Sequence, residues 1–393
     1  MAIGTALVVA SVTGIGVAAA QPIQATPDPD PFYSAPADLG GAAPGDVLKT
    51  RQLPPVPALI NTDVQQIMFR STNSAGAPIA ATTTLLLPRG YSPDAPVVSY
   101  QHIINGLGVH CTPSRALYTA NPFEWIWETP GLNSALQQGW VVALPDHLGP
   151  QSAYGAARLG AHITLDGVRA VQRSQFGLGG SPVTLAGYSG GGMTTLFAAA
   201  LAPRYAPEIR LLGAAAGGVP TNLERLVSMI DDQPHPAFGL AFAAAIGLER
   251  EYPHRFPTSR HLSPAGHALA TQLRDGCTQD LLNAGSNLGI ADVAPGASIV
   301  GTPEALGVLH ENSLRFAPET PTAPVYMWHS RNDSIIPYDD AAATAGRYCA
   351  GGTPVQFDTV GAEDHVQAAV EGAGPAMAYL ESLVRGQPAP SNC

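Results

Sequence analysis

The fold is decided by the stretch Leu185-Ala186-Gly187-Tyr188-Ser189-Gly190-Gly191-Gly192-Met193. The apolar residues that lead into it are typical of a buried strand, and the Ala-rich and Leu-rich residues 193–201 that follow are typical of a packed helix. A sharp strand-to-helix turn pushes a serine oxygen toward a base, and it tolerates only small residues two positions before and after the serine. Gly187 and Gly191 meet that requirement. The stretch therefore predicts a nucleophile elbow with Ser189 as the nucleophile.

A glycine-rich chain can contain such a motif by chance. With 42 glycines among 393 residues, the alternative is an ordinary glycine-rich turn that includes a serine. The order of strand, turn and helix favours the elbow instead. In an elbow, the backbone N–H of Gly190 lies where the negatively charged oxygen of an acyl-transfer intermediate develops.

A serine nucleophile needs a base and an acid that orients the base. In this architecture both follow the serine, in the order Asp or Glu and then His. Residues 324–329 have the pattern of a buried strand and lead into a loop that contains Asp333 and ends in Ile336-Pro337. A second strand-like run, 355–360, is followed by His365 at the start of a helix-forming segment. We expect His365 to be the base and Asp333 to orient it.

Other histidines and carboxylates fit these roles less well. Of the eleven histidines, four precede the serine and five fall in a middle segment that resembles an insertion. His329 lies in or at the end of a strand, where a packed or hydrogen-bonded imidazole is the simpler interpretation. Asp364 would have to fold back onto the ring of its neighbour. Asp339 and Asp340 resemble the carboxylates at a helix N-terminus.

The composition excludes several classes of protein. A hydrophobic content of 45% can bury a large core, and 12% charged residues is too few for a disordered chain. The net charge is -11 and the basic residues are scattered, which gives no electrostatic footprint for nucleic acid. Lys49 is the single lysine, which argues against Schiff-base chemistry and a P-loop. No metal or dinucleotide motif stands in a suitable context, so we expect neither a metal nor another cofactor.

The N-terminal residues indicate export. Residues 3–20 are apolar and small and end in Ala18-Ala19-Ala20, the pattern of a signal peptide and its cleavage site over residues 1–20. A basic segment before them is missing, so either the true start lies upstream or the signal is atypical. A membrane anchor is the alternative, but many glycines and alanines make a poor membrane span. We therefore expect a secreted protein with no permanent membrane span in the mature chain.

Four cysteines, which suggest disulfides in such a protein, permit three pairings.

Several separated motifs resemble the secretory lipase family of the Candida lipase A type. They are the elbow, the loop Asn332-Asp333-Ser334-Ile335-Ile336-Pro337, the pair Asp364-His365, and Ser99-Tyr100-Gln101 with Cys111-Thr112-Pro113-Ser114. The resemblance runs from about Asp30 to the end of the chain. It implies an α/β-hydrolase with a helical lid, hydrolysis of long-chain acylglycerols and other esters, and a catalytic triad of Ser189, Asp333 and His365. It also favours the disulfides Cys111–Cys277 and Cys349–Cys393.

One residue departs from the family pattern. The family has an aspartate in the loop after the Ser-Tyr-Gln strand, where it helps to form the oxyanion hole, and Asn105 stands at that position here. An amide can always donate a hydrogen bond, whereas a carboxyl can do so only when protonated. We expect Asn105, through its backbone or side-chain N–H, to complete an oxyanion hole with Gly190. The alternative is that Asn105-Gly106 is only a turn.

The pattern of elements independently suggests a mostly parallel, doubly wound sheet with helices between its strands. Segment 236–248 is apolar on every side, which is typical of a buried helix or of a lid that faces acyl chains. The cluster Phe123-Glu124-Trp125-Ile126-Trp127 is either a pocket wall or core. We expect a Pro-rich arm at 21–57, an α/β core at 58–218 and 312–393, and a helical cap or lid inserted at 219–311.

These features predict acyl transfer from an ester to water through an acyl-enzyme on Ser189. The expected partner is a lipid or ester substrate, at a lipid–water interface or in solution. Two alternatives stay open. The same triad serves acyltransferases and esterases of short or bulky esters, because the pocket and not the triad selects the acceptor. A non-catalytic cell-surface protein could also have this fold.

Overall fold

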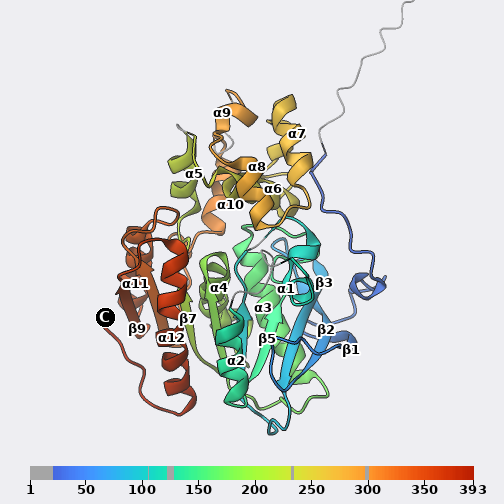
Figure 1. Cartoon of the computed structure of the whole chain (residues 1–393), viewed down its shortest axis with the longest axis vertical. Helices are drawn as coiled ribbons and strands as arrows, with labels where there is room; N and C mark the ends of the chain where they lie inside the picture. The colour runs from blue at the N-terminus through green and yellow to red at the C-terminus, as the bar shows by residue number, and fades with distance from the viewer. Residues whose placement is uncertain (1–20, 105, 122–127, 232–233, 297–300) are drawn as a thin grey trace, which may run out of the picture.

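The computed structural model describes residues 21–104, 106–121, 128–231, 234–296 and 301–393. Figure 1 shows an α/β core and, at its upper end, a separate group of helices. Within the described residues, nine strands form one sheet in the order β1-β2-β3-β5-β4-β6-β7-β8-β9. The strands are β1 Val47–Leu53, β2 Thr62–Thr72, β3 Pro78–Pro88, β4 Val97–Gln101, β5 Val141–Pro145, β6 Val183–Tyr188, β7 Leu211–Gly217, β8 Val325–Ser330 and β9 Val355–Val360.

The sheet is antiparallel at one edge and parallel elsewhere. β1, β2, β3 and β5 pair antiparallel, whereas β5, β4, β6, β7, β8 and β9 pair parallel. The mostly parallel sheet predicted from the sequence is therefore confirmed. The central strands are buried along their whole length in β5, β6 and β8, because helices cover both faces of a parallel sheet. This burial explains their continuous apolar sequences.

Two hydrophobic layers hold helices against the two faces of the sheet. α3, α4 and α11 contribute to one layer, and α2 and α12 contribute to the other. Neighbouring strand residues alternate between them: Leu185 faces the first layer and Ala186 the second, as the two-residue period of a strand requires. These helices are α2 Thr129–Gln137, α3 Ala157–Arg173, α4 Ser189–Tyr205, α11 Tyr338–Ala350 and α12 His365–Val384.

The helices between β7 and β8 form the upper group in Figure 1, which we call the cap. The cap has its own hydrophobic core, in which Phe238, Phe242 and Ile246 of α6 pack with residues of α7 and α8. Its helices occupy the middle segment that the sequence predicts as an insertion. They are α5 Leu223–Asp231, α6 Phe238–Glu251, α7 Pro264–Leu273, α8 Thr278–Gly285, α9 Ile290–Val293 and α10 Pro303–Glu311.

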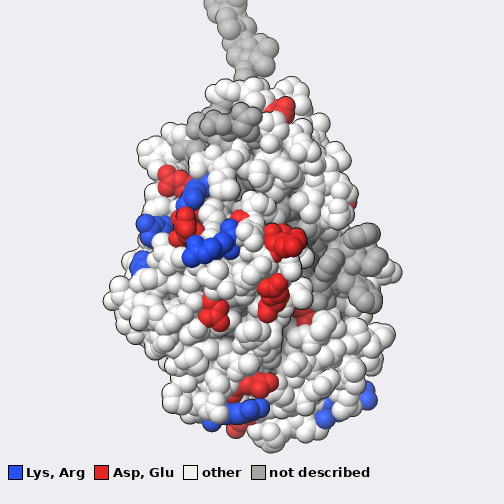
Figure 2. Space-filling view, turned by 60° about the vertical axis from the view of Figure 1, so that its left-hand side comes forward, with Lys and Arg blue, Asp and Glu red and all other residues white. Residues whose placement is uncertain are grey.

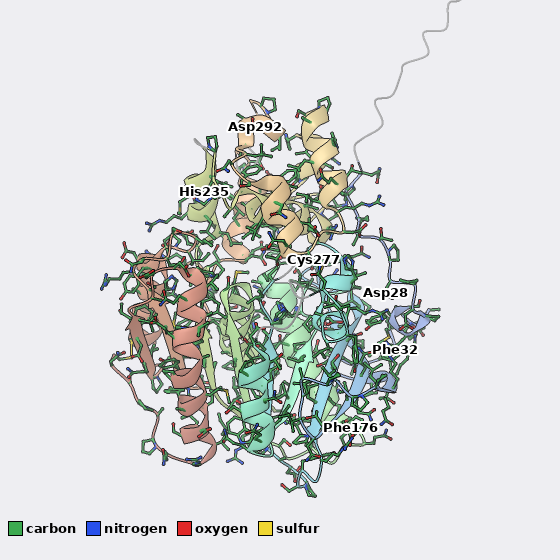
Figure 3. All side chains as sticks on the ribbon, viewed as in Figure 1. Asp28, Phe32, Phe176, His235, Cys277 and Asp292 are labelled. Atoms are coloured by element: carbon green, nitrogen blue, oxygen red, sulfur yellow. A yellow bond between two sulfur atoms is a disulfide. The ribbon has the colours of Figure 1, made fainter. Side chains whose placement is uncertain are left out.

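The N-terminal arm ends earlier than predicted. β1 begins at Val47, inside the range 21–57 that we expect to be an extended arm, and pairs with β2. β1 is an edge strand that is only partly buried and carries Lys49 and Arg51. Polar residues protect such an edge but weaken the apolar pattern by which a strand is recognised. The arm before β1 runs beside the core, where Figure 3 labels Asp28 and Phe32.

Two disulfides link distant segments. Cys111–Cys277 joins the loop after β4 to the cap, and Cys349–Cys393 ties the C-terminus to α11. These are the pairs that the family resemblance favours. Figure 3 labels Cys277 where the cap meets the core. Beside it, Leu107 donates its backbone N–H to the carbonyl oxygen of Gly276 at 2.9 Å. The loop after β4 is therefore fixed to the cap covalently and by the backbone.

Arg250, at the end of α6, joins the cap to the rest of the molecule. Its side chain is buried, and burial lowers its pKa to about 10, so the guanidinium stays charged at neutral pH. The guanidinium donates to carbonyl oxygens of the arm, the loop after β4, the loop after β5 and the cap. The acceptors are Ile23, Leu107, Gln151, Ser152 and Arg274, at 2.7 to 3.0 Å.

Arg250→Met is expected to lower the free energy of unfolding by about 3 kcal/mol or more, because the carbonyl oxygens lose a charged donor. Arg255→Met is the matched control, since Arg255 forms an ion pair with Glu311 in which both side chains are 40% exposed. Removing such a surface pair costs less than about 1 kcal/mol. Denaturant unfolding of the two variants measures the difference. Equal losses would contradict the role assigned to Arg250.

Charged side chains are sparse on the face shown in Figure 2, where acidic and basic residues stand in small mixed groups among uncharged ones. In the part of the chain that the structure describes, no helix is long and apolar enough to cross a bilayer.

Candidate active site

Ser189 lies at the junction of β6 and α4, where its backbone φ is 53°. This left-handed conformation is unfavourable for a residue with a side chain and marks a strained turn. A Cβ atom on Gly187 would lie 2.6 Å from the hydroxyl of Thr195, and one on Gly191 would lie 2.0 Å from the carbonyl oxygen of Gln101. Both positions therefore require glycine. The turn has the geometry of the predicted nucleophile elbow.

His365 lies between Ser189 and Asp333. Its Nε2 is 3.0 Å from the Ser189 Oγ, and its Nδ1 is 2.6 Å from Oδ2 of Asp333. Asp333 is in the loop after β8 and His365 is the first residue of α12, after β9. All three therefore stand beyond the carboxyl ends of parallel strands, where α/β sheets place their ligand sites. Because an ionised carboxylate only accepts, Nδ1 carries the proton, and Nε2 is left free to accept one from the serine.

The carboxylate of Asp333 is fully buried. Burial alone would raise its pKa, but hydrogen bonds from His329 and His365 hold the pKa well below its usual value. Its Oδ1 accepts the backbone N–H groups of Ile335 at 3.0 Å and Ile336 at 2.8 Å. Asp333 is therefore ionised at neutral pH and is fixed by its own loop. Sequence reasoning had no way to predict these contacts.

The residue before the serine supports the histidine. Tyr188 donates its hydroxyl to the carbonyl oxygen of His365 at 2.5 Å, and the two rings lie 5.0 Å apart. Asp364, a rejected candidate for the orienting acid, caps α12 instead by accepting the N–H of Gln367. The sequence predicts Tyr188 only as part of the elbow, because the elbow motif leaves this position free.

The loop after β4 passes close beneath the elbow. A Cβ on Gly190 would lie 2.3 Å from the side chain of Ile104, so only glycine lets the elbow and this loop approach so closely. The loop is held by buried His147, which donates from Nε2 to the carbonyl oxygen of His102 at 2.8 Å. Burial lowers the pKa of His147 to about 4, so it is neutral at neutral pH. Asn105, expected to complete the oxyanion hole, lies outside the described residues.

Ser189 opens into an apolar cavity of about 180 Å³ between the core and the cap. The core side of the cavity includes Ile104, Met193 and Ile336, and the cap side includes residues of α5 and α6. α6 contributes to the lining both small residues, such as Ala241 and Ala245, and large ones, such as Phe242. Phe242 also packs in the cap core, together with Ile246. The all-round apolar sequence of 236–248 thus reflects a helix with two apolar surroundings. The cluster Phe123 to Trp127 lies outside the described residues.

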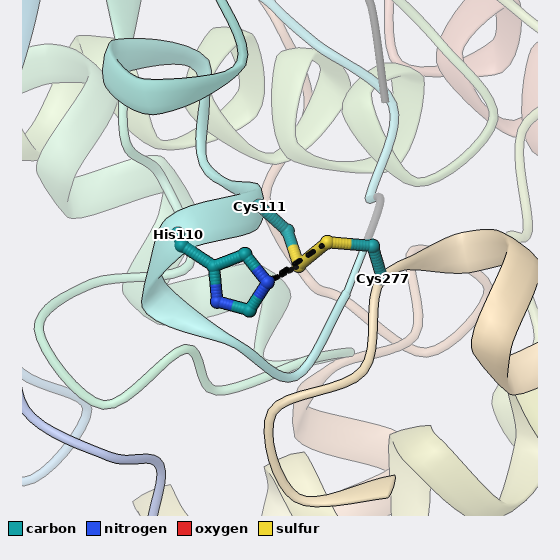
Figure 4. A group of neighbouring side chains, drawn as sticks. All are labelled: His110, Cys111 and Cys277. Atoms are coloured by element: carbon teal, nitrogen blue, oxygen red, sulfur yellow. Dashed lines mark hydrogen bonds between the residues drawn. A yellow bond between two sulfur atoms is a disulfide. The ribbon is translucent and has the colours of Figure 1, made fainter. Parts of the chain in front are cut away.

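Among the described residues, His110, Cys111 and Cys277 are close enough to suggest a metal site (Figure 4). The Nε2 of His110 lies 3.5 Å from the sulfur of Cys277. Cys111 and Cys277 are bonded to each other, however, and the ligand form of cysteine is the free thiolate. This group is therefore a disulfide with a neighbouring imidazole.

The sheet order, the elbow serine and the histidine after the last strand define the class of the protein as an α/β-hydrolase. The model of the secretory lipase family matches residues 121–392. A secreted triacylglycerol lipase of Malassezia furfur is 32% identical over 383 residues, which cover 93% of this chain and 77% of that one. The closed-state crystal structure of Candida antarctica lipase A, 26% identical, aligns with a TM-score of 0.86 over 93% of this chain and 89% of that one. The chain belongs to the secretory lipase family and is an ester hydrolase of the lipase type.

The relatives also include a probable inactive lipase of Mycobacterium tuberculosis, which is 30% identical over 383 residues, covering 92% of this chain and 83% of that one. Membership of the family is thus compatible with loss of activity in a particular member. The contacts of the individual side chains must therefore carry the assignment of catalytic roles.

Proposed function

We propose that Ser189 attacks the carbonyl carbon of an ester while His365 accepts its proton. Asp333 holds the imidazole and stabilises its charged form, and the backbone N–H of Gly190 donates to the oxyanion. Asn105 supplies the second donor. The intermediate collapses to an acyl-enzyme as His365 returns the proton to the leaving alcohol. Water then attacks the acyl-enzyme by the same sequence in reverse, which releases the acid and restores the serine.

The contacts of His365 with Ser189 and Asp333 carry this proposal. Once Nδ1 is bound to the carboxylate, Nε2 is left as the acceptor that a general base requires.

The substrates that we propose are acylglycerols and other esters with a linear acyl chain. The cavity beside Ser189 has a mostly apolar lining of aliphatic and aromatic side chains. A hydrocarbon chain gains free energy from leaving water for such a lining, at roughly 0.8 kcal/mol for each buried CH₂ group. Among the lining residues of α6, the small side chains of Ala241, Ala244 and Ala245 leave room for an acyl chain.

We infer further that the protein is exported and that residues 1–20 are its signal peptide.

The proposed acyl-chain site is tested by a substitution that narrows the cavity. Ala245→Leu is expected to lower kcat/KM for esters of long acyl chains about tenfold or more relative to short ones, because a pocket discriminates single carbon groups by 10- to 200-fold. The measurement is a series of rates on esters with acyl chains from about four to sixteen carbons, a range chosen to run from chains shorter than the cavity to chains that fill it.

Ala373→Leu is the matched control, since Ala373 is exposed on α12 and receives the same added bulk outside the cavity. It should leave the chain-length profile unchanged. A uniform loss across all chain lengths in Ala245→Leu, or no change at all, would show that the acyl chain binds elsewhere.

A further inference from the structure

A second imidazole lies beside the carboxylate of Asp333. His329, on β8, is fully buried. Its Nε2 lies 3.3 Å from Oδ2 of Asp333 and 3.0 Å from the carbonyl oxygen of Ile336. The sequence suggests that this histidine is merely packed or hydrogen-bonded, and it does not indicate the partner. Nε2 is hydrogen-bonded to the Ile336 carbonyl and also lies against the carboxylate oxygen that His365 contacts.

The neighbours of His329 determine which of its nitrogens carries the proton. Both atoms near Nε2 are acceptors, so Nε2 must be the donor. Nδ1 has no hydrogen-bond partner among the described residues. A charged imidazole would need to bury a second N–H without an acceptor, at a large cost. The Nε2–H of His329 is therefore directed between the carboxylate and the loop carbonyl.

The two oxygens of Asp333 have four donors around them. Oδ1 accepts from two backbone N–H groups, while Oδ2 has both His365 and His329 within reach. A carboxylate has about four such sites, so its capacity is filled. Without His329, the Oδ2 of Asp333 would be fixed on the side of His365 only. Oδ2 would also accept from one donor fewer, so hydrogen bonds would offset less of its negative charge.

We propose that His329 is a positioning residue of the catalytic site: its N–H fixes Oδ2 of Asp333 and moderates the attraction of this oxygen for the His365 imidazolium. The inference rests on the proposed roles of Ser189, Asp333 and His365. It assigns His329 no contact with substrate. It also explains why a histidine, and not an aliphatic residue, occupies a buried position in the strand that leads into the acid loop.

The effect on His365 depends on the charged and titratable groups that face it. Among the described residues these are Asp333 from the loop after β8, Tyr188 from β6 and Asp364 from its own chain segment. Asp333 and Tyr338, whose ring centroid lies 6.0 Å away, face His329. Removing the donor at position 329 leaves the ionised Asp333 with one hydrogen-bond donor fewer, so the carboxylate attracts the imidazolium form of His365 more strongly.

The test compares His329→Gln with His329→Met. The amide nitrogen of glutamine takes the place of Nε2 and keeps the donor, whereas methionine fills a similar volume without one. We expect His329→Met to lower kcat about ten- to hundredfold with little change in KM, as a misplaced catalytic group does. In the pH profile of kcat/KM, the acid limb, where activity is lost as His365 takes up a proton, should move up by about half a pH unit. His329→Gln should keep the wild-type limb.

The matched control is His162→Met, which removes another buried imidazole, on α3 and away from the triad. It should lower stability without moving the acid limb. An unmoved or lowered limb in His329→Met, or equal defects in His329→Met and His329→Gln, overturns the inference and leaves a packing role only. If His329→Met does not fold, His329→Asn replaces it, because its amide reaches only the position of Nδ1. The same outcomes then apply.

Ser189→Ala separates failure of this inference from failure of the proposed function. If Ser189→Ala is inactive while the variants at position 329 keep the wild-type limb and kcat, the triad stands and only the inference on His329 fails. If Ser189→Ala keeps its activity, the triad fails and the inference fails with it.

Discussion

Ser189→Ala is expected to lower kcat for ester hydrolysis about 10⁵- to 10⁶-fold, the loss that follows when a serine hydrolase loses its nucleophile. The remaining rate would come from substrate binding and the oxyanion donors, which alanine leaves in place. Alanine shares the strain of the left-handed conformation at this position, so the free energy of unfolding should change by less than about 1 kcal/mol. Steady-state rates and denaturant unfolding measure the two quantities.

Ser382→Ala is the matched control. Its hydroxyl donates to the carbonyl oxygen of Tyr379 within α12, far along the helix from His365. Its kcat should equal that of the wild type within a factor of about two, as expected of a surface change without a catalytic role. Activity of Ser189→Ala above a hundredth of the wild-type rate would exclude the proposed nucleophile. An inactive wild-type enzyme that fails to react with a phosphonate ester would instead support a non-catalytic protein on this fold.

Asp333→Asn is expected to lower kcat about 10⁴-fold while KM changes little. An amide at this position can donate to Nδ1 of His365, which would move the imidazole proton to Nε2. The nitrogen that faces the Ser189 hydroxyl would then be a donor and could no longer accept its proton. The amide oxygen can still accept the backbone N–H groups of Ile335 and Ile336, so the loop should keep its conformation. Steady-state kinetics on a soluble ester provide the measurement.

Asp364→Asn is the control for this prediction, because Asp364 is the neighbouring carboxylate that the sequence offers as a rival. Its side chain caps α12, and asparagine is an equally good cap. The activity of Asp364→Asn should therefore stay within a few-fold of the wild type, an effect too small to indicate a catalytic group. Comparable losses in the two variants would contradict the choice of Asp333.

Much of the sheet could be predicted from the sequence, because its central strands are buried on both faces. The predicted bounds of 355–360 agree with β9. β1 was missed because an edge strand needs few apolar residues. α3 begins at Ala157 and includes Gly160 and Gly167. There Gly160 packs so closely on Thr194 of α4 that an added Cβ would lie 2.9 Å from its hydroxyl. Tertiary packing selects that glycine, although glycine disfavours a helix locally.

The three residues that we propose as the triad were predictable because chain order and strand position constrain them strongly. The elbow needs small neighbours, and the acid and base must each follow a parallel strand. The supporting residues lacked such a constraint. Tyr188 and His329 act through contacts with segments far away in the sequence, and an isolated tyrosine or histidine in a strand does not reveal its partner. The disulfide pairing likewise came from the family resemblance, since four cysteines alone leave three possibilities.

The residues that line the cavity could not be predicted from the sequence either. The sequence marks α6 as apolar all round, but it does not distinguish the face that lines a pocket from the face that packs in the cap. Ala241 and Ala245 border the cavity, Ile246 lies in the cap core, and Phe242 belongs to both. Only the positions of the neighbouring helices determine which of these apolar residues border the cavity.

The most direct test of the central claim is a crystal structure of the enzyme after reaction with an alkyl phosphonate ester that mimics the tetrahedral intermediate. We predict phosphorus bonded to Oγ of Ser189, the alkyl chain in the cavity against α6, and a phosphonate oxygen facing the N–H of Gly190. His365 should remain hydrogen-bonded to Asp333. Phosphorus on another residue, or an imidazole of His365 turned away from the modified serine, would contradict the account.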